Sequence, residues 1–134
     1  METDIRAEFN SLYIQRKNDF DMEKLNKSNR MSQIVINGDT IYLAGQIPAD
    51  TTQDMKTQTE SVLGKIDALL ATAGSDKSKA LMATIYISDK SQVAAMNEAW
   101  DAWVTPDSPP ARACVEAQFP REGLLVEIII NAAR

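Results

Sequence analysis

Two largely apolar, β-rich runs, SQIVI and TIYLAGQI, flank Asn37 and Gly38 within Ser32–Pro48. An Asn-Gly pair favours the positive φ angles of a tight turn. This stretch therefore predicts a β-hairpin, which Pro48 closes.

A helical period follows the hairpin. From about Thr51 to Ala73 the apolar positions fall on one stripe, and Gly74 is placed to end a helix. The stripe consists of Met55, Val62, Ile66, Leu69 and Ala73. A second helix is predicted after Asp89, whose spacing to Gln92 is that of a capping pair. Its apolar stripe consists of Val93, Met96, Trp100 and Trp103.

Three further strands are predicted from apolar runs. Lys79–Ser88 separates the two helices, and its expected apolar face holds Leu81, Ala83, Ile85 and Ile87. Arg112–Gln118 and Leu125–Ile130 flank a PREG turn near the end of the sequence. The order is thus hairpin, helix, strand, helix, hairpin. It predicts an α/β (α+β) fold in which two helices pack on one face of a single mixed sheet.

Two of the strands are apolar on both faces. The runs Ile34–Ile36 and Glu127–Ile130 contain apolar residues at successive positions. Two helices on one side of the sheet leave the other side uncovered. We therefore expect a homo-oligomer that buries the second face.

The first 29 residues are polar and weakly periodic. We expect an N-terminal arm over residues 1–29, followed by a globular domain over 30–134. Within the arm, Leu12–Arg16 is a candidate first strand, and Lys17–Arg30 is read as a charged loop or an added helical turn. The length of 134 residues suits one globular domain.

The composition narrows the possible functions. The net charge of −5 and the pI near 4.7 argue against binding to nucleic acid, because phosphate backbones favour basic surfaces. No apolar run is long enough to span a bilayer, and the first residues lack the pattern of a signal peptide. We therefore expect a cytoplasmic protein that does not bind membranes.

Histidine is absent, and Cys114 is the sole cysteine. An internal disulfide, a multi-cysteine metal site and the Ser-His-Asp and Cys-His catalytic arrangements are thereby excluded. Acid–base chemistry would have to use Glu, Asp, Lys, Tyr or Cys.

The last two predicted strands carry candidate chemistry. A period of two places Arg112, Cys114, Glu116 and Gln118 on one strand face. Glu127 lies in an otherwise apolar strand, where a carboxylate requires a partner or a function. Antiparallel pairing through the PREG turn would bring Glu127 near Arg112 and Cys114.

Each candidate also has a structural interpretation. Arg112 could be a surface arginine with Glu127 as its ion-pair partner. Cys114 could be a small buried hydrophobe, because no histidine is present to activate it. The two tryptophans are read as core, and Asn97, polar beside the apolar stripe, is open to either reading.

The stretches PPARACVEA and VEIIINAAR resemble the C-terminal signature of the reactive intermediate deaminase (Rid, or YjgF-type) family. The resemblance extends upstream through RMSQIVINGDTIYLAGQIP, GSDKSKALMATIYISD and AAMNEAWDAW, and covers residues 30–134. It implies a chorismate-mutase-like fold and a homotrimer with clefts between subunits. It also implies hydrolysis of 2-enamine and 2-imine acids, such as 2-iminopropanoate, to 2-keto acids and ammonia, with no metal or cofactor.

The resemblance also implies roles for individual residues. Arg112 corresponds to the arginine that holds the substrate carboxylate, Cys114 to a cysteine of the pocket, and Glu127 to the acid that positions or activates water.

Further residues of the resemblance surround these three. Gly45 and Gln46 lie in a strand motif beside the pocket, and Asn97 corresponds to a helix asparagine near the site. Met31 stands where the family's archetypes carry a cleft tyrosine, and Ala44 stands where serine is commoner. These departures leave the substrate preference open.

We thus expect an imine/enamine deaminase. An imine carbon is already electrophilic, so hydrolysis requires a carboxylate clamp, a base for water and a dry pocket. Arginine offers a planar fork that matches a carboxylate. One alternative is a non-catalytic, carboxylate-binding trimer that keeps Arg112. Another is a ribonuclease or translation inhibitor, against which the acidic charge and the absence of histidine count.

Overall fold

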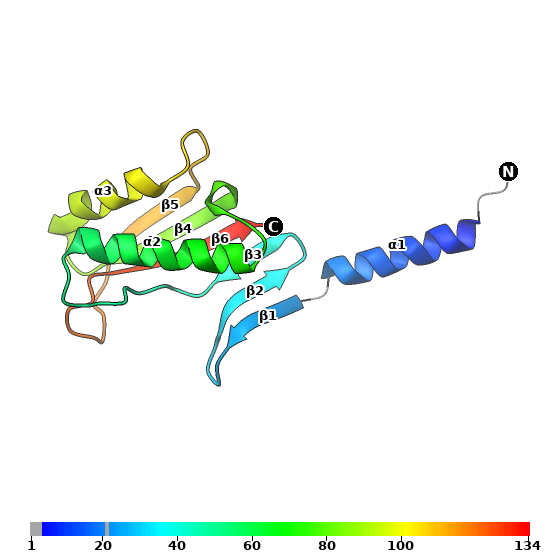
Figure 1. Ribbon diagram of the computed structural model, residues 1–134, viewed down its shortest axis with the longest axis horizontal. Coiled ribbons are helices and arrows are strands. Elements are labelled where there is room, and N and C mark those ends of the chain that lie inside the picture. The colour runs from blue at the N-terminus through cyan, green and yellow to red at the C-terminus, as the bar shows by residue number, and fades with distance from the viewer. Residues whose placement is uncertain (1–3, 21) are drawn as a thin grey trace.

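The computed structural model describes residues 4–20 and 22–134. A single mixed sheet has the strand order β1-β2-β3-β6-β4-β5 and carries two helices on one face (Figure 1). The strands are β1 (Met22–Lys27), β2 (Ser32–Asn37), β3 (Thr40–Leu43), β4 (Ala80–Ile87), β5 (Ala111–Glu116) and β6 (Val126–Ala133). The helices are α1 (Ile5–Phe20), α2 (Met55–Thr72) and α3 (Val93–Trp103), with short 3₁₀ turns η1 (Lys77–Lys79) and η2 (Lys90–Gln92). The predicted α+β class, with two helices packed on one face of the sheet, is confirmed.

The core lies between the sheet and the pair α2 and α3. Along β6, Val126, Ile128 and Ile130 are fully buried, whereas the residues between them are half-buried on the opposite face. Fully burying each such side chain stabilises the fold by about 1.5–3 kcal/mol. The helices contribute the buried side chains Val62, Leu63, Ile66, Leu70 and Met96.

The predicted hairpin forms, with its turn shifted by one residue. Asn37 is still paired with Thr40, so Gly38 and Asp39 make the two-residue turn. Gly38 has φ 61°, whereas the φ angle of Asp39 is negative. Glycine at the first turn position is the pattern of a type II′ hairpin. Asn37 therefore ends the strand and takes no part in the turn's reversal.

The end of α2 at Gly74 is as predicted, while the cap expected for α3 differs. The side chain of Asp54 accepts a hydrogen bond from the backbone of Thr57 and caps α2, and Gly74 follows its end with φ 78°. Asp89, expected to cap α3, instead caps the 3₁₀ turn η2 by accepting from Ser91 N. No side chain caps α3, because η2 leads directly into it.

The prediction that Leu81 lies on the buried face of β4 is wrong. Ala83, Ile85 and Ile87 are buried as predicted, but Leu81 is 49% exposed. The register against β6 shifts between Ala80 and Met82, so one extra residue lies outside the ladder. Such an irregularity reverses the side-chain alternation on its N-terminal side, and Ala80 is buried there instead.

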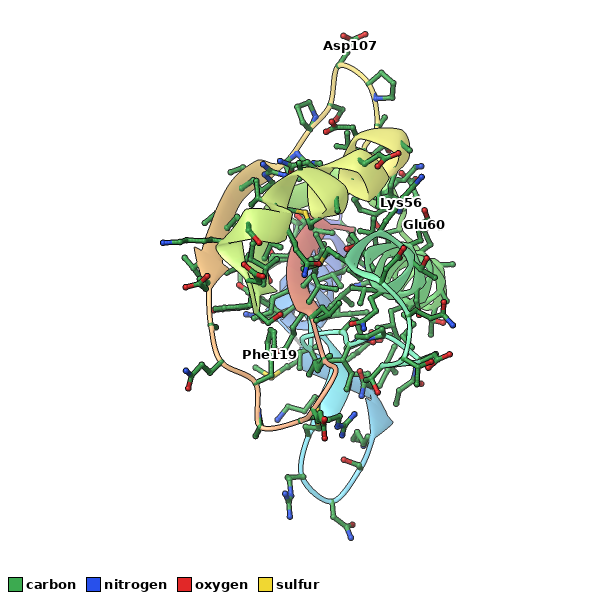
Figure 2. All side chains as sticks on the ribbon, turned by 90° about the vertical axis from the view of Figure 1, so that its left-hand side faces the viewer. Lys56, Glu60, Asp107 and Phe119 are labelled. Carbon is green, nitrogen blue, oxygen red and sulfur yellow. The ribbon has the colours of Figure 1, made fainter. Side chains whose placement is uncertain are left out.

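The C-terminal hairpin is also wrong. β5 runs parallel to β4, and β6 runs antiparallel to β4 on its other side. β4 therefore separates the two strands that flank the PREG turn. Their connection, marked by Phe119 in Figure 2, runs from one side of β4 to the other.

The predicted strand over Leu12–Arg16 is wrong, because these residues lie in helix α1. The first strand is β1, within the stretch expected to be a loop, and it pairs with β2 at the edge of the sheet. The sheet thus extends to Met22, on the N-terminal side of the expected boundary at residue 30. Figure 1 shows α1 apart from the sheet, and its apolar residues Ile5, Phe9 and Leu12 are exposed. None of the helices in the described ranges is long and apolar enough to cross a membrane.

Candidate active site

Arg112 is held between β5 and α3. It pairs in register with the fully buried Ala83 of β4, so its side chain lies on the helix-covered face of the sheet. Its Nη1 donates a hydrogen bond of 2.7 Å to Oδ1 of Asn97, and its Cζ lies over the ring of Trp100, 5.5 Å from the centroid. Two groups on α3 therefore orient one exposed guanidinium.

Arg112 has no carboxylate partner among the residues that the structure describes. Their ion pairs join Lys56 to Glu98 and Arg134 to Glu23. The reading of Arg112 and Glu127 as an ion pair within one chain is therefore wrong. Arg112 presents an uncompensated positive charge with unused hydrogen-bond donors at the edge of the sheet.

Cys114 lies on the same strand face as Arg112, as the period of two predicts. It is half-buried and packs against the core. Burial raises the pKa of the Cys114 thiol, and the positive charge of Arg112 opposes that shift only in part. A raised pKa favours the neutral thiol, so the side chain suits a pocket wall better than a nucleophile.

Glu116, on this same face, has a structural role. Its Oε2 accepts a hydrogen bond of 2.7 Å from the backbone of Lys90. This contact fixes the start of η2 against β5 and thereby helps to set the position of α3.

Glu127 lies on β6, away from the β5 edge that holds Arg112. It pairs with Tyr86 across β4 and β6, between the fully buried Val126 and Ile128. Its side chain therefore lies on the sheet face that the helices leave open, opposite to Arg112. The expectation that Glu127 meets Arg112 and Cys114 within one chain is wrong, because β4 lies between their strands.

Gly45 and Gln46 accompany Glu127. A Cβ atom on Gly45 would collide with Oε1 of Glu127. Gln46 is 8% exposed and forms a backbone bridge with Ile128, while its Nε2 donates to Oε1 of Gln33 at 2.8 Å and to the carbonyl of Ala44 at 2.9 Å. Gln46 thus fixes the segment that brings the Gly45 backbone beside the carboxylate.

Met31 lies far from Arg112 within the chain. It is 44% exposed just before β2, in a loop held by hydrogen bonds between Ser28 Oγ and the backbone of residues 30 and 31. β2 and β5 are four strand spacings apart, or about 19 Å. Any shared site would require Met31 from a different subunit.

The predicted site residues therefore form two groups. The first group, Arg112, Cys114 and Asn97, lies at the β5 edge against α3. The second group, Gly45, Gln46 and Glu127, lies on the open face of the sheet. Trp100, read as core from the sequence, also contacts the first group. Its position three residues after Asn97, on the same side of a helix, was the available signal.

A cavity of about 470 Å³ lies elsewhere, between α2 and α3. Its lining includes Leu63, Gly64, Ala99, Ala102 and Trp103, with charged residues at the rim. Figure 2 shows two of the rim residues, Lys56 and Glu60, beside each other where the helices meet. None of the predicted site residues lines this cavity, so the chemistry expected from the sequence lies outside it.

Comparison with proteins of known sequence and structure identifies the family to which the chain belongs. A family model described as endoribonuclease L-PSP matches residues 22–134. A RutC family protein of Haemophilus influenzae is 44% identical over 112 residues, which cover 83% of this chain and 97% of that protein. The crystal structure of a YjgF-family protein from Neisseria meningitidis superposes with a TM-score of 0.84 at 40% identity, covering 87% of this chain and 97% of the other. A protein of the Rid family from Yersinia pestis superposes with a TM-score of 0.74 at 32% identity, covering 81% and 90% of the two chains. The chain therefore belongs to the YjgF (Rid) family, whose family model carries the description endoribonuclease L-PSP.

Proposed function

We propose that the protein is an imine/enamine deaminase, which hydrolyses 2-imino and 2-enamino acids to 2-keto acids and ammonia. The observation that carries the proposal is the guanidinium of Arg112. It is exposed, oriented by Asn97 and Trp100, and unpaired with any carboxylate of the described residues. Such a group suits a small substrate with one carboxylate handle.

The reaction needs no redox partner. Water adds to C2 of the imine, and one of its protons passes to the nitrogen. In the resulting carbinolamine the hydroxyl proton passes to the nitrogen as the C2–N bond breaks, which releases ammonia and leaves a C2 carbonyl. An enamine enters the same route after protonation at C3 gives the imine. The tasks for the protein are to hold the carboxylate and to orient and deprotonate water.

We assign the binding of the substrate carboxylate to Arg112. We assign the orientation and deprotonation of water to Glu127. The Gly45 backbone lies beside the Glu127 carboxylate, so that substrate atoms could approach it without meeting a side chain. Cys114 forms part of the pocket wall in this assignment. The two groups must meet, and within one chain they lie on opposite faces of the sheet.

A homotrimer would resolve this separation. We propose that the group containing Arg112 in one subunit faces the group containing Glu127 in its neighbour. Two features support a partner on the open face of the sheet. Tyr42 and Val115 are each 45% exposed there, and Ile129 and Val35 are only half-buried. Large apolar side chains on an uncovered sheet face are typical of subunit contacts.

A second candidate function is binding without turnover. Arg112, Asn97 and Trp100 are assembled within a single chain, whereas Glu127 is remote from them. A trimer could therefore hold carboxylates even if the Glu127 group failed to orient water. The description endoribonuclease belongs to the family model. The net charge of −5 and the absence of histidine argue against RNA cleavage by this chain.

A direct assay tests the proposal. An amino-acid oxidase generates 2-iminopropanoate from alanine, semicarbazide traps the imine that remains, and the protein competes by hydrolysing it. Less semicarbazone and faster pyruvate formation are expected. Wild-type protein that binds pyruvate but leaves the semicarbazone rate unchanged would favour binding without turnover. Cleavage of RNA at the same protein concentration would favour the nuclease reading.

A further inference from the structure

Trp100 occupies an unusual place for a core tryptophan. It is 5% exposed and belongs to the apolar stripe of α3. Its ring nevertheless lies beneath the guanidinium of Arg112, whose Cζ is 5.5 Å from the ring centroid. The indole therefore connects the core to the one charged group of the first site group.

Asn97 and Trp100 restrict the guanidinium in different ways. Asn97 accepts from Nη1 and fixes one end of the fork. Trp100 lies under the group and fixes its height and tilt, because a cation prefers the electron-rich face of an aromatic ring. Tryptophan does this more strongly than phenylalanine, and leucine provides no such attraction.

These contacts leave a defined part of Arg112 free. A guanidinium can grip a carboxylate through Nη1 and Nη2 or through Nε and Nη2. One donor of Nη1 is used by Asn97, and no other hydrogen bond from the Arg112 side chain occurs within the part of the chain that the structure describes. The Nε/Nη2 edge is thus the one whose donors are all free to take both oxygens of a carboxylate.

We infer that Trp100 is a positioning residue, which holds Arg112 so that its Nε/Nη2 edge receives the carboxylate of a small 2-oxo or 2-imino acid. The identity of this anion rests on the proposed function. Trp100 acts through Arg112 and does not itself touch the reacting carbon. Its substitution should weaken anion binding and raise KM while leaving kcat much less affected.

Trp103 provides a matched control in the same helix. It is 9% exposed, and its ring packs against Trp100 with centroids 5.2 Å apart. Its own polar contacts differ: Nε1 donates to Asp67 at 3.0 Å, and the cation over its ring is Lys77. A purely structural role would make the two tryptophans respond alike to the same substitution.

The first experiment compares Trp100→Phe and Trp100→Leu with Trp103→Phe and Trp103→Leu. Calorimetry measures the Kd for pyruvate, and thermal unfolding checks that each variant is folded. At position 100 we expect Kd to rise in the order Trp, Phe, Leu, by roughly tenfold at the end of the series. At position 103 no such gradient is expected. Equal weakening at both positions, or none at position 100, overturns the inference.

The second experiment uses fluorescence and requires no turnover. The chain has two tryptophans, so Trp103→Phe leaves Trp100 as the only one. Pyruvate bound at Arg112 should change the Trp100 emission saturably, and adding Arg112→Ala should abolish the change. Pyruvate binding seen by calorimetry with unaltered Trp100 emission overturns the inference.

The results separate this inference from the proposed function. If pyruvate binds with the predicted dependence on Trp100 but 2-iminopropanoate is not hydrolysed, the inference stands and the deaminase proposal fails. If hydrolysis occurs with the same KM in Trp100→Leu, the deaminase stands and the inference fails. If the folded protein neither binds pyruvate nor hydrolyses 2-iminopropanoate, both fail.

Discussion

A Cβ atom on Gly45 would lie 3.0 Å from Cδ and 3.2 Å from Cγ of Glu127, and it would overlap Oε1 of the same carboxylate. The atoms that would collide belong to the end of a flexible side chain. An added methyl group would therefore displace the carboxylate and leave the backbone in place. A substitution at Gly45 can therefore move the Glu127 carboxylate with little effect on the stability of the fold.

The first prediction follows from that contact. Gly45→Ala should lower kcat for imine hydrolysis by about 10- to 100-fold, because small misplacement of a reacting group is costly. Its free energy of unfolding should change by less than about 1 kcal/mol. Semicarbazone competition and urea denaturation measure the two effects.

Gly64 supplies the control for this prediction. It lies within α2, and a Cβ there would meet no atom within 4 Å. Gly64→Ala should raise the free energy of unfolding by about 0.5–1 kcal/mol, since alanine is the better helix former. Its activity should equal that of the wild type. If Gly64→Ala lost as much activity as Gly45→Ala, the loss in Gly45→Ala could not be attributed to displacement of the Glu127 carboxylate.

The second prediction concerns the fork of Arg112. Arg112→Lys keeps the charge but cannot reproduce the planar pair of donors, so its kcat/KM should fall clearly. Arg112→Ala should lose roughly 2–5 kcal/mol of transition-state stabilisation, the scale for truncating one member of a buried charge pair. Steady-state kinetics and light scattering together test this. Full activity, or a loss of activity that is explained by unfolding, would return Arg112 to a structural role.

The third prediction concerns Cys114. Because burial raises the pKa of its thiol, less thiolate is present at any pH below that pKa than for an ordinary cysteine. Iodoacetamide should therefore label Cys114 slowly at pH 7–8, and the labelling rate should rise at higher pH than for a free thiol. The comparison compound is N-acetylcysteine at the same pH values.

Activity gives a fourth prediction, on the same residue. If Cys114 is a pocket wall, Cys114→Ser should keep substantial deaminase activity, within roughly tenfold of the wild type. A folded Cys114→Ser protein without activity, or a covalent adduct on the sulfur detected by mass spectrometry, would indicate nucleophilic catalysis instead.

The fifth prediction concerns assembly. Light scattering at micromolar concentration should show a trimer. Val115→Lys should dissociate it, because a lysine on the open sheet face would bury a charge in the subunit contact. Ala71→Lys makes the same change of charge at an exposed position on α2 and should leave the trimer intact. A wild-type monomer would remove the shared site proposed above.

Local patterns in the sequence determine much of this fold. The period of two places Arg112 and Cys114 on one strand face, and the helical stripes identify α2 and α3. These features depend on residues a few positions apart, so the sequence shows them directly. The motifs around them also indicated the family correctly. The same reasoning failed at Leu12–Arg16, where a short apolar stretch is compatible with either a helix or a strand.

The tertiary structure alone decided how the two groups of site residues relate. Alternation along a strand shows which residues share a face, but it does not show which strand lies beside which. β5 and β6 are adjacent in the sequence and joined by a turn-like segment, yet β4 pairs with both and separates them. That choice puts one strand between Arg112 and Glu127, and the registers of the two pairings, Arg112 with Ala83 and Glu127 with Tyr86, place them on opposite faces. Strand order depends on contacts between distant parts of the chain, and the residues of the turn carry no information about a third strand between the two that they connect.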